Sequence, residues 1–286
     1  MSAAPGPRHW VIAADDFAID AGAIDGIVDL IERGRVTATS ALVETPLWRS
    51  AARALPADLR SGDTSKRRAD IGLHVNLTEG FGGRPAEFGS LWKLLARSAL
   101  RWLSRPRVRD ALERQFDAYE DAMGRAPDYV DGHHHIHQFP VVRDELVAIL
   151  LRRYAGRMPW IRSTKPPQDL RDRKARVIDA LGDSSLCAMA RESGIRTSAW
   201  MVGVYDFRPD GESYWEDMRE WIRSGPDGSV LMCHPAREKR EGDPIASGRL
   251  MEFTELGGER FGAALSQANI VLTTGSRLFT NKSVAY

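Results

Sequence analysis

The chain has 286 residues, of which 43% are hydrophobic and 28% charged, an ordinary composition for a soluble globular protein and not that of a disordered one. Forty Lys and Arg residues balance 39 Asp and Glu residues, so the net charge of +1 creates no global field to attract nucleic acid or an anionic membrane. Two cysteines are too few for a disulfide framework, and neither a signal-like N-terminus nor an 18-residue apolar run is present. We therefore expect a cytoplasmic protein that binds neither nucleic acid nor membrane.

Short apolar segments of strand length alternate along the chain with longer segments of helical periodicity. This alternation is typical of βα units around a parallel sheet. Eight strands are predicted, over residues 10–15, 37–43, 70–75, 129–133, 160–163, 198–202, 229–234 and 270–273.

Helices are predicted between these strands from apolar residues that recur every three or four positions. The first follows Asp20, a candidate N-cap, and stops at Gly34. A second begins near Pro106 and ends at Gly124, and further helices are expected around 141–154, 213–224 and 247–266. Eight strands, each followed by a crossover, predict an α/β fold with one distorted (β/α) TIM-like barrel, a single domain over residues 1–286.

The segment LWKLLARSALRW, residues 91–102, has two contrasting faces. Its basic residues lie on one helical face and its leucines and Trp102 largely on the opposite one. Such a helix could dock on a membrane surface or on a partner, but a barrel helix with a solvated basic face is the favoured interpretation. Trp48, Trp92 and Trp215 could stack on sugar rings, although packing in the core is the commoner fate of a tryptophan.

Four predicted strands end in ionisable residues: VIAADD, DIGLHVN, YVDGHHHIH and VLMCHPA. The carboxyl ends of the strands of a parallel barrel all emerge on one face, where active sites are built. Asp15, Asp16, His74, the histidines of 133–137 and His234 are therefore expected to converge. Each of these signals is weak alone, because an isolated His or Asp pair is common in proteins.

The histidine tract is predicted to continue its strand. Strict alternation then places Asp131, His133, His135 and His137 on one side, and His134 on the other, packed behind the strand. One odd-numbered histidine is expected to ligate a metal ion. Another would contact substrate or support the ligands, and Asp131 would orient a ring through its distal nitrogen.

Five motifs keep their order and spacing through most of the chain: ADDFAIDAGAIDGI (14–27), GRVTATSAL (34–42), IGLHVNLTEG (71–80), GRAPDYVDGHHHIHQFP (124–140) and MCHPA (232–236). On these residues the chain resembles the YdjC-like carbohydrate deacetylase family, and is chitooligosaccharide deacetylase-like. The resemblance implies a distorted barrel that binds one divalent ion and removes acetyl groups from N-acetylated sugars. It also implies Asp16, His74 and His133 as metal ligands and Asp15 as catalytic base.

Two positions depart from the family pattern. Ala18 stands where the family usually has Gly after ADDF, and Glu44 lies in the region where an Asn often ends the second strand. The second change lies near the expected substrate pocket, so we do not transfer chitooligosaccharide specificity to this chain.

The expected chemistry follows from two imidazoles and one carboxylate, which leave positions open on an ion that prefers four to six ligands. Water in such a position has its pKa lowered from about 16 toward 7, which makes it the nucleophile. His234 is the candidate general acid for the amine, and Arg162 could hold Asp15 in its charged form. Because Asp15 and Asp16 are neighbours, both reach the site only if the backbone turns there.

Two other functions stay open at this point. An amidohydrolase-type metallohydrolase could use the same barrel, although such enzymes carry an H-x-H pair where this chain has Asp-Asp. A non-enzymatic metal-binding or sugar-binding module would explain the histidines but not the second carboxylate. The ion could be zinc, magnesium, cobalt or manganese, with two histidines favouring the softer ions over magnesium. A homodimer is the base-rate expectation for a soluble enzyme.

Overall fold

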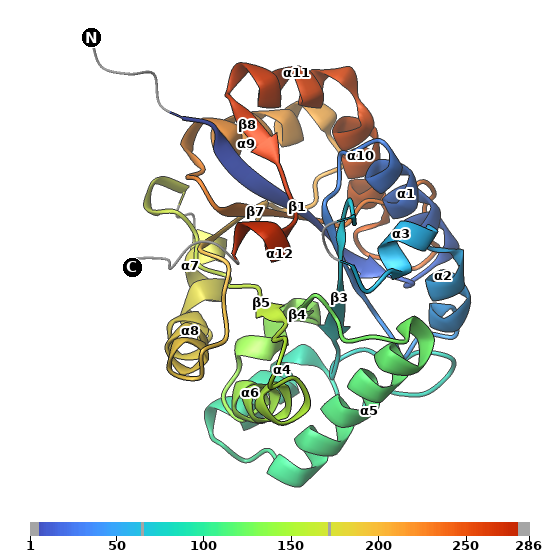
Figure 1. Ribbon diagram of the computed structural model, residues 1–286, viewed down its shortest axis with the longest axis vertical. Coiled ribbons are helices and arrows are strands. Elements are labelled where there is room, and N and C mark those ends of the chain that lie inside the picture. The colour runs from blue at the N-terminus through green and yellow to red at the C-terminus, as the bar shows by residue number, and fades with distance from the viewer. Residues whose placement is uncertain (1–5, 64–65, 171–172, 280–286) are drawn as a thin grey trace.

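The computed structural model describes residues 6–63, 66–170 and 173–279. All eight predicted strands are present, and every paired strand is parallel to its neighbour (Figure 1). The strands are β1 (Arg8–Phe17), β2 (Ala38–Ala41), β3 (Asp70–Val75), β4 (Tyr129–Gly132), β5 (Trp160–Ile161), β6 (Trp200–Val202), β7 (Ser229–Cys233) and β8 (Ile270–Leu272).

The sheet is a curled half-barrel, not the full barrel that the sequence predicts. Seven strands run in the order β5-β4-β3-β2-β1-β7-β6. The eighth, β8, pairs with β1 only over Arg8 to Trp10, while β7 takes the next part of β1, from Val11 to Ala14. At one edge of the sheet, β5 has only two residues, and within the described residues it is joined to the segment before β6 by one isolated parallel bridge, between Ile161 and Thr197, instead of a ladder.

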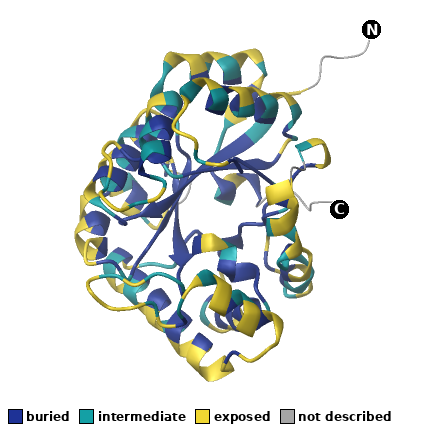
Figure 2. Ribbon diagram, turned by 180° about the vertical axis from the view of Figure 1, so that it is seen from behind, coloured by how far each residue is buried: buried dark blue, intermediate teal, exposed yellow. Residues whose placement is uncertain are grey.

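Helices surround the strands on the outside of the molecule, except the short α12, which lies near the centre of the view in Figure 1. They are α1 (Ala21–Glu32), α2 (Trp48–Ala54), α3 (Ala57–Arg60), α4 (Leu91–Ala99), α5 (Arg105–Met123), α6 (Val142–Arg153), α7 (Arg173–Ala180), α8 (Asp183–Glu192), α9 (Gly211–Ser224), α10 (Ala246–Gly257), α11 (Glu259–Gln267) and α12 (Gly275–Leu278). Figure 2 shows their outer faces exposed and the strands buried.

The predicted helix ends agree with local chemistry. The Asp20 carboxylate accepts the backbone N–H of Ala23 at 2.8 Å, which satisfies one of the free donors at the start of α1. Gly124 ends α5 in the left-handed conformation, with φ 66°. The single helix predicted over 247–266 is instead two helices, because Gly258 between α10 and α11 is extended.

The α4 segment packs through Leu94 and Ser98, which are buried, while Trp92 on the same helix is 76% exposed. The basic face is solvated, as in the favoured interpretation. No helix in the described part of the chain is long and apolar enough to cross a membrane.

Candidate active site

The end of β1 carries an irregularity that positions both acidic residues. Ala14 is in register with Thr39 and Phe17 with Ala41, so β1 contains one residue more than β2 over this interval. Asp16, inside this bulge, has a φ of 63°. A bulge breaks the strict alternation of side chains, and as a result Asp15 and Asp16 line the same cavity.

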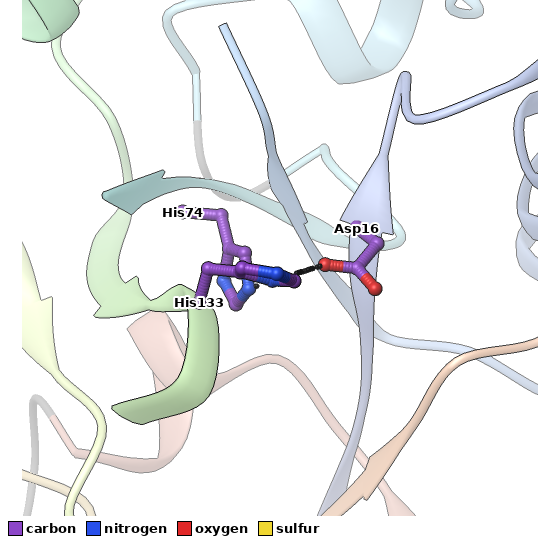
Figure 3. A group of neighbouring side chains, drawn as sticks. All are labelled: Asp16, His74 and His133. Atoms are coloured by element: carbon purple, nitrogen blue, oxygen red, sulfur yellow. Dashed lines mark hydrogen bonds and ion pairs between the residues drawn. The ribbon is translucent and has the colours of Figure 1, made fainter. Parts of the chain in front are cut away.

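Three nitrogen and oxygen atoms from separate strand ends meet beside this bulge (Figure 3). Asp16 Oδ1 lies 3.0 Å from His133 Nδ1 and 3.4 Å from His74 Nε2. All three residues are buried, and their donor atoms lie within 4.8 Å of one another. Ligands at 2.0–2.2 Å from a tetrahedral ion stand about 3.3 Å apart, so the spacing and the donor types fit one divalent transition-metal ion.

Each of the three side chains is fixed from behind by a charged partner. Asp131 Oδ1 lies 2.6 Å from His74 Nδ1, and Glu79 Oε2 lies 2.9 Å from His133 Nε2. These contacts leave His74 Nε2 and His133 Nδ1 directed at Asp16, an arrangement typical of metal-binding histidines. Arg249 donates to Asp16 Oδ2 at 2.6 Å, so Oδ1 remains for an ion.

The local charges perturb the protonation of these groups. Burial alone would raise the pKa of Asp16, but Arg249 and His133 hold it well below its usual value. Burial would lower the pKa of His74, whereas the adjacent Asp131 carboxylate raises it to about 10. The carboxylate of Asp16 is therefore charged at neutral pH.

Arg162 compensates the negative charge of Asp15 and Asp131. This fully buried guanidinium donates to both Asp15 oxygens, at 2.5 and 2.7 Å, and lies 3.1 Å from Asp131 Oδ2. Asp15, His74 and Asp131 also stand close enough to hold an ion. Arg162 occupies both oxygens of Asp15, whereas Arg249 contacts one oxygen of Asp16 and leaves the other facing the two imidazoles, so the group of Asp16 is the better cation site.

His234 directly follows β7, with its Nε2 3.9 Å from Asp15 Oδ2. Burial lowers the pKa of His234 to about 4, so its ring is neutral at rest. Its backbone N–H donates to Glu252 Oε2, and Tyr205 donates to the other Glu252 oxygen at 2.7 Å. Burial raises the pKa of Glu252 to about 7.

The histidine tract does not continue β4, and the predicted alternation is wrong. Residues 133–138 form a 3-10 segment in which His134 and His135 have left-handed φ values of 55° and 58°. Gly132 permits this turn, because a Cβ there would lie 2.9 Å from the backbone nitrogen of His137.

This turn redistributes the tract. His134 is not packed behind the strand but exposed at the cavity, with Nδ1 3.1 Å from Thr78 Oγ1. His135 also lines the cavity, and burial lowers its pKa well below the usual value. His137 instead donates to the backbone carbonyl of Arg162 at 2.9 Å, which ties the tract to β5, and is not among the cavity-lining residues.

The cavity that contains this group has a volume of about 590 Å³, within the usual range for small-molecule sites. Among the three tryptophans considered from sequence, Trp92 lines it. Trp48 is buried and donates to the Ala118 carbonyl, and Trp215 is buried under the Arg260 guanidinium.

Comparison with known proteins identifies the family. The model of the YdjC-like protein family matches residues 10–267. The chain belongs to the YdjC-like family. A human protein named carbohydrate deacetylase is 30% identical over 201 residues, which cover 65% of this chain and 57% of the human one. The aligned part thus spans little more than half of that relative.

Two further comparisons cover more of the matched protein. The chitooligosaccharide deacetylase of Serratia marcescens is 27% identical over 232 residues, 79% of this chain and 81% of the relative. A crystallised protein of Enterococcus faecalis V583, whose name proposes cellobiose-phosphate cleavage, superposes with a TM-score of 0.69 at 20% identity, covering 96% of this chain and 100% of that one. The last likeness shows that the two proteins share a fold.

One departure from the YdjC-like pattern now has a structural meaning. Ala18, at the position where the family usually has Gly, has a φ of 75°. A residue with a Cβ is strained in that region and glycine is not. The fold therefore keeps the backbone that suits glycine even though this chain has alanine.

Sequence reasoning missed Glu79, Tyr205, Arg249 and Glu252 as site residues. The clearest sequence signal for these residues was on α10, where Arg249 and Glu252 share a helical face with the buried Leu256. Charged residues at apolar positions of a helical pattern need buried partners. The partners of Arg249 and Glu252 lie on other elements and could not be assigned from spacing.

Proposed function

We propose that this protein is a divalent-metal-dependent hydrolase that removes acetyl groups from N-acetylated sugars or oligosaccharides. The observation that carries the proposal is the group of Asp16, His74 and His133, with the separate carboxylate Asp15 beside it in one cavity. A protein that merely stores a metal has no need of a second buried carboxylate. The names of the human and Serratia relatives support the substrate class.

In this proposal Asp16, His74 and His133 hold the ion. When bound, the ion would polarise the acetyl carbonyl and acidify water. Zinc, cobalt or manganese suit two imidazoles better than magnesium does. Asp131 and Glu79 fix the two rings, so the ligand nitrogens are oriented before the ion arrives.

Asp15 acts as general base, held in place by the two hydrogen bonds from Arg162. It takes a proton from water as the water oxygen bonds to the acetyl carbon. Asp15 then gives that proton to the neutral His234, whose Nε2 lies 3.9 Å from Asp15 Oδ2, and His234 delivers it to the sugar nitrogen as the C–N bond breaks. The products are acetate and the free amino sugar, and His135 and His134 line the cavity that receives the substrate.

The test is acetate release from a panel of N-acetylated sugars, with each of the four metals supplied to ion-free protein. Asp16→Ala and His133→Ala should lose bound metal, measured by elemental analysis. Asp15→Asn should keep the metal and lose at least about 100-fold in kcat, the usual contribution of a general base. Full activity in Asp15→Asn refutes the base assignment, and no acetate from any sugar refutes the substrate class.

A further inference from the structure

The mouth of the candidate site is lined by aliphatic and aromatic side chains. Residues of α4 and α7 and the residue after α7 share the cavity with the metal-binding group and form what we call the apolar wall: Leu91, Trp92, Leu95, Val177, Ile178 and Leu181. Trp92 is 76% exposed and Val177 is 55% exposed. Apolar surface of this kind is therefore open to solvent next to the reacting centre.

A bare oligosaccharide is a poor match for this wall. Each sugar ring carries several hydroxyl groups, and a hydroxyl that leaves water must find a hydrogen-bond partner. Leucine, isoleucine and valine side chains offer none. Polar groups of the cavity such as Asp15, His135 and Arg240 belong to other elements. Lys174 of α7 also lines the cavity, but its ammonium group donates to the backbone carbonyl of Tyr205.

We propose that the substrate is an N-acetylated amino sugar that carries an apolar aglycone, and that this aglycone packs on the apolar wall while the acetamide reaches the metal-binding group. This inference rests on the proposed deacetylase function and narrows its substrate class. The wall is continuous with the candidate site, because one cavity contains both. An alkyl or aryl group loses contact with water there at a gain that grows with its buried area.

The experiment compares glycosides that differ only in the aglycone. Methyl, phenyl and octyl N-acetyl-glucosaminides, below the concentration at which the octyl compound forms micelles, and N,N′-diacetylchitobiose are supplied to the metal-loaded protein, and acetate is measured. We expect kcat/KM for the octyl or phenyl glycoside to exceed that of the methyl glycoside by about tenfold or more, through a lower KM. The phenyl and octyl arms distinguish an aromatic from an aliphatic aglycone.

Substitutions at two equally exposed residues provide a matched control. Val177 and Leu100 are both 55% exposed, but only Val177 belongs to the apolar wall. Val177→Asn should reduce the octyl-to-methyl preference several-fold, whereas Leu100→Asn should leave the kinetics unchanged. Trp92→Ala should reduce the preference as well.

The outcomes separate this inference from the proposed function. Equal kcat/KM for methyl and octyl glycosides overturns the aglycone proposal while leaving deacetylation intact. Preference for chitobiose over the octyl glycoside, lost in Trp92→Ala, also overturns it, because the wall would then stack a second sugar. No acetate from any of the four compounds refutes the deacetylase function itself.

Discussion

Replacing Arg162 with methionine should strongly destabilise the protein. The guanidinium is fully buried and pairs with Asp15 and Asp131, which are 2% and 0% exposed. Asp131 retains its contacts with His74 and Ser40. Asp15 loses both of its hydrogen bonds from Arg162 and keeps two weaker neighbours, the His74 ring within 4.8 Å and a neutral His234 at 3.9 Å. Asp15 therefore becomes a buried charge that has lost its hydrogen-bonded counter-charge.

Removing one partner of a buried ion pair costs about 3–5 kcal/mol. For a chain of this size we take about 2 °C per kcal/mol, which gives a fall in melting temperature of roughly 6–10 °C. Thermal unfolding of ion-free Arg162→Met, followed by circular dichroism, measures the change. Arg223→Met is the control, because its pair with Glu220 is on the surface and should leave the melting temperature unchanged.

A double variant tests why Arg162→Met loses stability. In Arg162→Met with Asp15→Asn the uncompensated charge is gone, so the double variant should recover at least half of the lost stability. If the double variant is no more stable than Arg162→Met, the destabilisation comes from lost packing around the arginine side chain, and the electrostatic reasoning is wrong.

Two further substitutions test smaller effects. Glu252, with its pKa raised from 4.5 to about 7, keeps a proton in the folded protein that the unfolded chain loses. The free energy of unfolding of the wild type, relative to that of Glu252→Gln, should therefore fall by on the order of 3 kcal/mol as the pH rises from about 4.5 to 7. Urea unfolding measures both proteins, and a difference between them that stays constant from pH 5 to 8 contradicts this. Ala18→Gly should stabilise the protein by up to about 1 kcal/mol, because the φ of Ala18 is positive. Ala96→Gly, within α4, is the control and should destabilise the protein by about as much. If both variants shift the urea midpoint in the same direction, backbone strain at Ala18 is not the cause.

The strands could be predicted from the sequence because each is a short apolar run between turn residues. The closure of the sheet could not. It depends on which part of β1 pairs with β8 and on the two-residue length of β5, and both are set by contacts between segments far apart in the chain. Local patterns carry no information on such pairing.

The candidate site likewise has a part that the sequence predicts and a part that it does not. The convergence of Asp16, His74 and His133 was predictable, since strand ends in a parallel sheet meet at one edge. Arg249 and Glu79 come from a helix and a loop, whose approach to that edge depends on packing. The histidine tract was misjudged because Gly132 allows the chain to turn where alternation assumed a strand.

The balance of buried charge around the site favours a divalent ion. Four carboxylates, Asp15, Asp16, Asp131 and Asp243, face two guanidiniums, Arg162 and Arg249, so ion-free protein has an excess of negative charge. An imidazole can supply the missing charge by holding a proton. Burial opposes this, but Asp131 raises the pKa of His74 to about 10, so His74 holds that proton at neutral pH.

A metal ligand must give up its proton, so metal uptake at pH 7 should release at least one proton, that of His74. Against the effect of burial, Asp16 and Glu79 also raise the pKa of His133, the other imidazole of the group. Calorimetric titration of zinc into ion-free protein, in two buffers of different ionisation enthalpy, gives the number released. Asp131→Asn should lower that number, because His74 then loses the carboxylate that holds its proton. Zinc binding without proton release in the wild type would mean that His74 is neutral before the ion arrives, and the charge balance would have to be met elsewhere.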